Sequence, residues 1–231
     1  MLDDMELVKE MELLDNMSIE ELGVGLETPE QQREKDIKTI LKKNTEGTVD
    51  DNVEAVYNYK NIDGTNKYRM VKLKSGEPFM VQTYQNGNWE YGLNGIKKIP
   101  YNLPNISKAN NEVIFIVNGE RKVDEFEKLG FTATTAPFNS KHKWKKDYNN
   151  YLKTSRGVII IEDNKADSSE YAQNTFETIK KDISNVGIVG IKDIATLLNI
   201  KLEDNTDILD LKEKVNVEEF KNLITELEKQ M

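Results

Sequence analysis

The amino-acid sequence predicts an α/β protein with a mostly parallel sheet flanked by helices, preceded by a small β-rich subdomain and an N-terminal helical segment. Unbroken apolar runs at residues 113–117 and 158–161 are typical of strands buried on both faces. Segments with the apolar spacing of helices follow both runs, and strands that alternate with helices usually form a parallel sheet. Residues 53–92 carry strand and turn patterns instead, which predicts a separate β-rich part ahead of the α/β part.

Residues 1–45 are predicted to form an acidic helical appendage. Leu7, Met11 and Leu14 recur at spacings of four and three residues, which places a narrow apolar stripe on an otherwise acidic segment. Short helices of this kind bury little apolar surface alone, so they either dock on the domain or fold onto a partner. The narrow stripe favours a partner protein, and residues 1–45 are therefore a candidate docking arm.

Residues 46–110 are predicted to form the small β-rich subdomain, with residues 44–52 as a linker that carries no apolar pattern. The dipeptide Asp63-Gly64 between two strand-like segments is a strong hairpin signal. Prolines within residues 99–104 predict an end to regular structure there. We expect strands at 56–59, 68–71, 79–84 and 89–91.

Residues 111–231 are predicted to form the α/β domain, which ends in an amphipathic helix. Val123, Phe126 and Leu129 share one face of a helix after the first buried strand, and Gly130 is well placed to end that helix. The expected order is strand 113–117, the helix that ends at 129, strand 131–135, a helix around 148–152, strand 158–161, helix 168–183, strand 186–191 and helix 217–230.

The composition excludes several kinds of site. The absence of cysteine excludes disulfides, thiolate zinc sites and cysteine nucleophiles, and the single histidine, His142, excludes a histidine-based metal cluster. No apolar run approaches the roughly 20 residues that span a bilayer, and the acidic start lacks the basic residues of a signal peptide. We therefore expect a soluble, cytoplasmic protein with no membrane contact.

Charge is distributed unevenly along the chain. The net charge of −9 divides into −8 for residues 1–50, +6 for residues 51–158 and −7 for residues 159–231. Acidic ends therefore enclose a basic middle, and this middle segment is the better candidate for contact with polyanions.

A lysine-rich loop lies within the basic middle. Its lysines flank a tryptophan, and basic residues interleaved with an aromatic side chain suit single-stranded nucleic acid. The alternative is a solvated charged face with the tryptophan anchored in the core, and His142 is expected at the surface. The candidate nucleic-acid-binding residues of this loop are Lys141, Lys143, Trp144, Lys145 and Lys146.

Polar residues follow the buried strands at the point where each strand ends. Asn118, Gly119 and Glu120 come after the first buried strand, and Asp163 lies at the end of the 158–161 strand. Ligands bind at the carboxyl ends of parallel strands, and carboxylates gathered there suit Mg²⁺. The alternative is a capping role, in which Asp163 or Asp167 caps the following helix.

Three short motifs carry a resemblance to a known family. The sequences V-N-G-E-R at 117–121, I-E-D-N-K at 161–165 and T-D-I-L-D at 206–210 resemble the three signatures of the Toprim fold. More narrowly, they are similar to primase-like Toprim proteins of phages, plasmids and other mobile elements. The corresponding patterns of that group are V-E-G-E-K-D, a D-N-D run and D-V-S-D-W.

The resemblance extends, in order, over about residues 53–215. Residues 134–137 followed by Lys143 and Trp144 resemble the T-T-N-P…K-W stretch of those proteins. Residues 57–104 resemble their small β-rich subdomain. The resemblance implies a Toprim fold and work on nucleic acid.

Two departures from the family pattern predict a degenerate catalytic centre. The family's general acid/base glutamate is replaced by Asn118, and loss of such a group typically costs about 10²–10⁴ in rate. The second aspartate of the family's metal-binding D-x-D pair is replaced by Lys165. An ammonium about 4 Å from Mg²⁺ opposes binding by about 4 kcal/mol per unit charge at an effective dielectric of ~20.

The carboxylates that remain leave Mg²⁺ as the one cofactor suggested by the resemblance. Asp163, Asp207 and Asp210 are the candidate metal ligands, and Glu120 is the acidic residue nearest the altered acid/base position. Lys165 with Arg121 is an alternative phosphate site, because a lysine and an arginine can bind a phosphate that a metal would otherwise bridge.

The leading hypothesis is a non-catalytic, primase-like protein of a phage or mobile element that binds nucleic acid or a nucleic-acid-processing protein. One alternative is a stand-alone phage counter-defence inhibitor that acts by protein–protein binding. The other is an active Mg²⁺-dependent nucleotidyltransferase or nuclease with a rearranged metal site.

Overall fold

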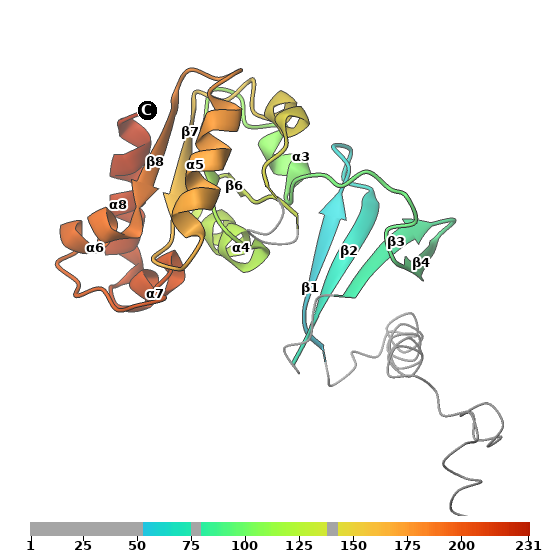
Figure 1. Cartoon of the computed structure of the whole chain (residues 1–231), viewed down its shortest axis with the longest axis horizontal. Coiled ribbons are helices and arrows are strands. Elements are labelled where there is room, and N and C mark those ends of the chain that lie inside the picture. Colours follow the sequence, from blue (N-terminus) through green and yellow to red (C-terminus); the bar gives the residue numbers. More distant parts are fainter. Residues whose placement is uncertain (1–52, 75–79, 138–142) are drawn as a thin grey trace, which may run out of the picture. The chain divides into compact units, whose positions relative to one another are not determined.

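The computed structural model describes residues 53–74, 80–137 and 143–231, which belong to one compact unit spanning residues 51–231. Figure 1 shows an antiparallel sheet and a parallel sheet with its helices in this unit. The predicted helical arm, Lys141 and His142 lie outside the described residues. The predicted domain divisions near residues 45 and 110 stay predictions.

The antiparallel sheet has the strand order β1-β2-β3-β4. Asp63 and Gly64 form the turn between the first two strands, where Gly64 has a φ of +85° and the Thr65 amide donates to Asp63 Oδ1 at 2.9 Å. The two strands pair antiparallel on either side of this turn, which confirms the predicted hairpin. Glycine suits the position because it adopts a positive φ readily. The strands are β1 (Val53–Lys60), β2 (Asn66–Leu73), β3 (Met80–Gln85) and β4 (Asn88–Tyr91).

One face of the antiparallel sheet is buried in a core shared with the parallel sheet. Tyr59 and Tyr68 stack with their ring centroids 4.4 Å apart, and Tyr57 and Met70 are buried beside them. The same hydrophobic cluster contains Ile114 and residues of the helices on that side. The shared core therefore joins the two sheets.

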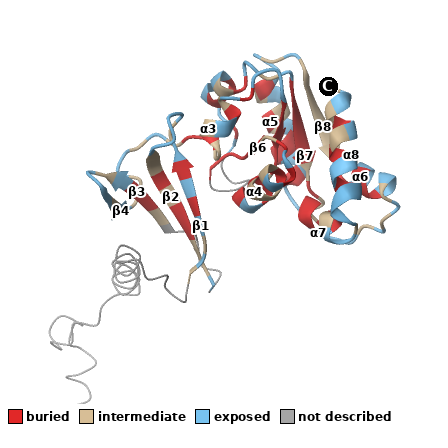
Figure 2. Ribbon diagram, turned by 180° about the vertical axis from the view of Figure 1, so that it is seen from behind, coloured by how far each residue is buried: buried red, intermediate tan, exposed pale blue. Residues whose placement is uncertain are grey.

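The parallel sheet has the order β6-β5-β7-β8, with every neighbouring pair parallel. Both predicted apolar runs are strands of its interior, and Figure 2 shows β7 as buried. Alternate residues enter two separate hydrophobic clusters, one on each face of the sheet. The strands are β5 (Val113–Ile116), β6 (Ala133–Thr134), β7 (Gly157–Glu162) and β8 (Val186–Gly190).

Helices cover both faces of the parallel sheet, which confirms the predicted fold class. Phe126 and Phe220 belong to one cluster, whereas Ala172 and Tyr148 belong to the other. The helices are α3 (Leu103–Ile106), α4 (Glu120–Leu129), the 3₁₀ helix η1 (Lys146–Tyr151), α5 (Ser168–Ile179), α6 (Ile191–Leu197), α7 (Ile208–Glu213) and α8 (Val217–Lys229).

Several element ends differ from the sequence predictions. Gly130 ends α4 in the left-handed conformation as predicted, with a φ of +92°. The segment 99–104 was predicted to end regular structure, but helix α3 begins within it. Pro104 lies in the first turn of α3, where its missing N–H costs no hydrogen bond. In the part of the chain that the structure describes, no helix is long and apolar enough to cross a membrane.

Candidate functional site

The carboxyl edge of the parallel sheet brings two chain segments together. Ile116 of β5 pairs with Ile160 of β7 in register, so the residues after these strands lie side by side. Gly119 has a φ of +118°, a conformation that glycine adopts readily, and it turns the chain from β5 into α4. The first turn of α4 consequently faces Asp163 at the end of β7.

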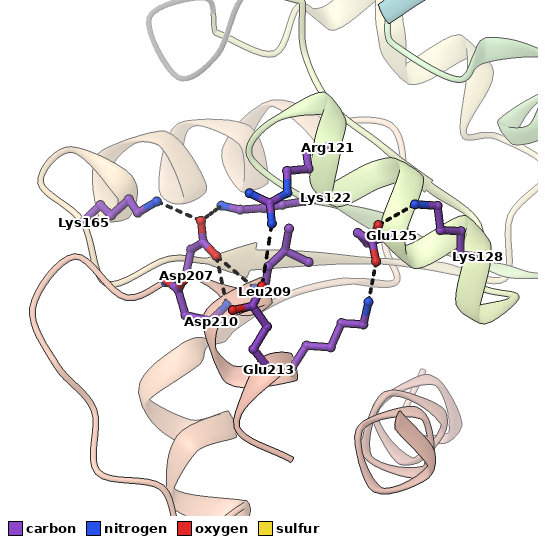
Figure 3. Close-up of polar contacts among 10 residues, drawn as sticks. Arg121, Lys122, Glu125, Lys128, Lys165, Asp207, Leu209, Asp210 and Glu213 are labelled. Atoms are coloured by element: carbon purple, nitrogen blue, oxygen red, sulfur yellow. Dashed lines mark hydrogen bonds and ion pairs between the residues drawn. The ribbon is translucent and has the colours of Figure 1, made fainter. Parts of the chain in front are cut away.

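Lys122 and Asp163 form a buried ion pair at this edge. The two residues are 6% and 5% exposed, and Lys122 Nζ contacts Asp163 Oδ2. The same ammonium lies 3.3 Å from Asp207 Oδ2, and Lys165 Nζ lies 2.9 Å from that oxygen. Figure 3 shows Lys122 and Lys165 approaching Asp207 from two sides. Two lysines therefore neutralise two carboxylates.

Asp207 and Asp210 also form the capping box of α7. The Leu209 amide donates to Asp207 Oδ1 at 2.9 Å, and the Asp207 amide donates to Asp210 Oδ2 at 2.6 Å. The capping hydrogen bonds therefore fix the positions of these two carboxylates, which are predicted metal ligands. The alternative capping role for Asp163 or Asp167 is wrong, because Asp163 is paired with Lys122 and the Asp167 side chain makes no cap hydrogen bond.

The balance between burial and the ion pairs shifts the pKa values of Asp163 and Asp207 in opposite directions. Burial alone would raise the pKa of Asp207, but the hydrogen bond from Lys165 and the charge of Lys122 lower it to about 2. Burial raises the pKa of Asp163 above its ordinary value despite the opposing effect of Lys122. Asp207 is therefore the more firmly ionised of the two.

This arrangement does not fit Mg²⁺ as it stands. Magnesium needs carboxylate oxygens that are free to coordinate it, whereas Lys122 and Lys165 occupy those of Asp163 and Asp207. Asp163 Oδ1 is buried and has no hydrogen-bond partner among the described residues, but one oxygen is not a metal site. Those residues include no group of three or more acidic or histidine side chains placed to hold a metal ion. The predicted ligand role of Asp163, Asp207 and Asp210 stays a prediction.

Glu120 connects the first turn of α4 to the antiparallel sheet. Its carboxylate is buried and accepts a 2.5 Å hydrogen bond from the Tyr59 hydroxyl of β1. Burial raises the pKa of Glu120, and the hydrogen bond from Tyr59 opposes this rise only in part. Glu120 therefore positions one sheet against the other instead of facing solvent.

An open cavity of about 310 Å³ lies over this edge. Arg121 and Lys165 enter it with side chains that are 71% and 39% exposed. The partner of Arg121 is Glu213 at 3.7 Å, an exposed pair of little strength. The lining residues are Tyr57, Lys72, Asn118, Gly119, Glu120, Arg121, Lys122, Asp163, Lys165, Asp207 and Leu209.

The predicted basic loop lies apart from this cavity. Lys143, Lys145 and Lys146 are exposed, and none of them lines it. Trp144 is 3% exposed, and its Nε1 donates to Asn149 Oδ1 at 2.9 Å. The structure supports the core-anchor interpretation of Trp144, because a buried ring cannot stack on a base.

The sequence prediction missed two cations of the site. Lys122 directly follows V-N-G-E-R, at the place where the family pattern has an aspartate, so the pattern itself contained the signal. Lys72 comes from β2 and reaches the cavity from the antiparallel sheet. No local pattern predicts that position, because it depends on the packing of the two sheets.

Comparison with known proteins supports the fold. No protein-family profile and no curated sequence matches the chain. The DnaG catalytic core is similar over 86% of this chain and 60% of that chain, with a TM-score of 0.55 and 14% identity. The E. coli primase catalytic core is similar over 74% and 51%, with a TM-score of 0.54 and 15% identity. The fold is that of primase catalytic cores.

A third solved structure is the DnaG primase catalytic domain bound to ssDNA, which is similar over 74% of this chain and 52% of that chain, with a TM-score of 0.52 and 13% identity. The chain thus spans between about half and three fifths of the primase chains it matches. The primase-core likeness confirms the predicted Toprim-like sheet preceded by a β-rich part.

Proposed function

We propose that this primase-fold protein binds nucleic acid through the cavity at the carboxyl edge of its parallel sheet and does so without metal-dependent catalysis. One observation carries the proposal: the ammonium groups of Lys122 and Lys165 lie on the carboxylates of Asp163 and Asp207. The family's acid/base position is Asn118, which cannot exchange a proton at neutral pH.

The buried ion pair between Lys122 and Asp163 makes metal binding energetically costly. Breaking a buried ion pair by removing one partner typically costs about 3–5 kcal/mol. A magnesium ion that coordinated Asp163 would either share that carboxylate with the Lys122 ammonium or leave the ammonium to Asp207 alone, and both weaken the buried pair. This cost favours a binding role over a catalytic one.

The exposed cations of the cavity suit phosphate. Arg121 offers a planar guanidinium whose ion pair with Glu213 is weak, and Lys165 keeps more than a third of its side chain exposed. Arginine binds phosphate oxygens with two parallel hydrogen bonds, and lysine adds a point charge. Together these side chains would contact consecutive phosphates of a nucleic acid backbone.

The narrower hypotheses concern origin and partner. A phage or mobile-element origin and a degenerate metal site are proposed from the resemblance of the three motifs. The acidic arm at residues 1–45 is proposed to dock a nucleic-acid-processing protein. A counter-defence inhibitor that binds only protein and an active Mg²⁺-dependent enzyme are the competing outcomes of the test below.

The test measures binding of a labelled 20-nucleotide oligothymidine to the full chain at several salt concentrations, in EDTA and in Mg²⁺. We expect binding in both, and we expect Arg121→Gln/Lys165→Gln to reduce the salt slope by about 1.4, since each phosphate contact on a single strand contributes about 0.7. The matched control, Lys128→Gln/Lys229→Gln, removes two exposed lysines from α4 and α8.

Four results would contradict the proposal. An equal loss in the control pair would show that only net charge matters. Absolute dependence on Mg²⁺, or incorporation of nucleotides, would favour the enzyme. A chain that binds no oligonucleotide but captures a protein would favour the inhibitor.

A further inference from the structure

The face of the antiparallel sheet that points away from the shared core gathers aromatic and basic side chains. Arg69 of β2 pairs with Gln82 of β3, and Gln82 pairs with Tyr91 of β4, so these three residues share one face. Tyr84 pairs with Trp89 and lies two residues beyond Gln82, which places both on the same face. This set, with Lys67 two residues before Arg69, is called the aromatic face below.

The rings of the aromatic face are accessible and stand next to a cation. Tyr84 and Tyr91 are 37% and 47% exposed, and both belong to the small set of exposed large hydrophobic side chains among the described residues. The centroids of Tyr84 and Trp89 are 5.0 Å apart, and the Arg69 guanidinium carbon lies 4.2 Å from the Trp89 centroid. The cation–π contact holds the Trp89 ring in place, which reduces the entropy that a ligand would otherwise lose on stacking.

The charge of this face has one sign. Among the described residues that β2, β3 and β4 place on it, Lys67 and Arg69 are basic and none is acidic. Exposed rings beside cations and without carboxylates fit a ligand that is both anionic and flat. Single-stranded nucleic acid combines phosphates with unpaired bases, whereas a duplex hides the faces of its bases.

Two hydrogen-bond donors of this face also lack acceptors. Arg69 Nη2 and Gln82 Nε2 are buried and make no hydrogen bond within the described part of the chain. The Arg69 Nε–H donates to Gln82 Oε1, which orients the amide and leaves its nitrogen as the unused group. Because these nitrogen atoms are buried, they belong to the layer beneath the exposed rings, and the ligand contacts assigned to this face are those of the rings.

We propose that the aromatic face binds the bases of single-stranded nucleic acid by stacking on Trp89, Tyr91 and Tyr84. The proposal rests on the proposed function for the nature of the ligand and adds a second contact surface to it. The carboxyl-edge cavity contacts phosphates, and the aromatic face contacts bases. The aromatic face therefore contributes only to the binding of polyanions that carry bases.

The chain offers a direct reporter of this contact. Its two tryptophans are Trp89, on the aromatic face, and Trp144, which is buried. The experiment titrates the full chain with a 12-nucleotide oligothymidine and, separately, with inorganic polyphosphate, and follows tryptophan emission. We expect the oligonucleotide to quench emission and polyphosphate to leave it unchanged. Trp89→Phe should abolish the quenching.

Affinity measurements on matched variants complete the test. Tyr91→Ala is expected to weaken oligothymidine binding at least about fivefold, the smallest loss expected for one stacked base, and to leave polyphosphate binding unchanged. Leu197→Ala, which truncates a 66% exposed apolar side chain on α6, serves as the control and should bind both ligands normally. Unchanged polyphosphate affinity also shows that each variant is folded.

The outcomes separate the two proposals. Oligothymidine binding without Trp89 quenching, or with normal affinity in Tyr91→Ala, overturns the aromatic-face proposal and leaves the proposed function standing. Weaker binding of both ligands in Arg121→Gln/Lys165→Gln with intact quenching supports both. No binding of oligothymidine to the unmodified chain overturns both and points to a protein as the occupant of this face.

Discussion

The ammonium group of Lys122 and the carboxylate of Asp163 are in contact inside the fold, 41 residues apart in sequence. Lys122 belongs to the first turn of α4, and Asp163 follows β7. The pair stands at the sheet edge where the resemblance predicts a metal centre. A lysine therefore neutralises a carboxylate that Mg²⁺ would neutralise in the family pattern.

Lys122→Met should destabilise the protein strongly. The substitution leaves Asp163 buried and unpaired, which typically costs about 3–5 kcal/mol. The double variant Lys122→Met/Asp163→Leu should recover most of this loss, because apolar residues of similar volume often replace a buried ion pair at little cost. Urea denaturation measures both effects, provided that the dependence of the unfolding free energy on urea concentration, the m-value, is the same in all variants.

The control for this prediction is Lys128→Met on the same helix. Lys128 pairs with Glu125 on the surface (Figure 3), and Lys212 contacts the same glutamate. An exposed pair contributes about 0–1 kcal/mol, so this variant should remain close to the unmodified chain. A single Lys122→Met change with an equally small effect would show that the buried pair is not important for stability.

Asn118→Glu/Lys122→Asp/Lys165→Asp should create a magnesium response. The three changes restore the residue types of the family pattern at the sheet edge and remove both ammonium groups from the carboxylates, which then repel one another until a cation binds. With a Kd of about 1 mM and 10 mM Mg²⁺, stabilisation would be about 1.4 kcal/mol, or about 3–6 °C in the melting midpoint. Thermal melts in EDTA and in Mg²⁺ measure the difference.

The unmodified chain is the reference for this response and should melt at the same temperature in both buffers. Ca²⁺ at the same concentration reports on the size selectivity of the created site. A Mg²⁺-dependent rise in the unmodified chain that Asp163→Ala abolishes would instead establish a working metal site in the native sequence and favour an enzyme.

Glu120→Gln should increase stability at neutral pH. The folded state raises the pKa of Glu120 chiefly by burial, so this carboxyl favours folding below its unfolded pKa, and that contribution is lost as pH rises through the folded pKa. Glutamine remains uncharged and still accepts the Tyr59 hydroxyl hydrogen bond. We expect a gain in stability at pH 7 that shrinks as pH falls below the raised pKa of Glu120, measured by urea denaturation at several pH values.

The exposed Glu90 of β4 provides the matched control, since Glu90→Gln removes a carboxylate charge without changing a buried hydrogen bond. This variant should show no such pH-dependent gain. A loss of stability at pH 7 in Glu120→Gln would mean that the ionised carboxylate is needed to hold the two sheets together.

Local sequence was enough to predict the elements whose own residue types reveal whether they are buried, turn or end. The apolar runs of β5 and β7 predicted interior strands, because a strand buried on both faces has no polar alternation. Asp63-Gly64 and Gly130 predicted a turn and a helix end, because Gly64 and Gly130 adopt a positive φ that glycine favours. Such features depend on only a few neighbouring residues.

Local sequence was insufficient where one residue type suits two environments. Trp144 lies in a run of lysines, yet Tyr148 packs against its ring at 5.4 Å and Asn149 binds its nitrogen. Short helices α6 and α7 were not predicted, because their few apolar residues become a buried face only when packed against β8 and α4. Tertiary packing therefore determined the burial of Trp144 and the formation of α6 and α7.

The sequence by itself determined the α/β class, the order of the strands and of helices α4, α5 and α8, and the two altered positions, Asn118 and Lys165. Tertiary structure alone decided which charges meet: Lys122 with Asp163, and Lys165 with Asp207. Hydrophobic periodicity is a local property and can be recognised in a single segment. An ion pair depends on the distance between side chains brought together by sheet pairing, and the sequence around either residue does not contain that distance.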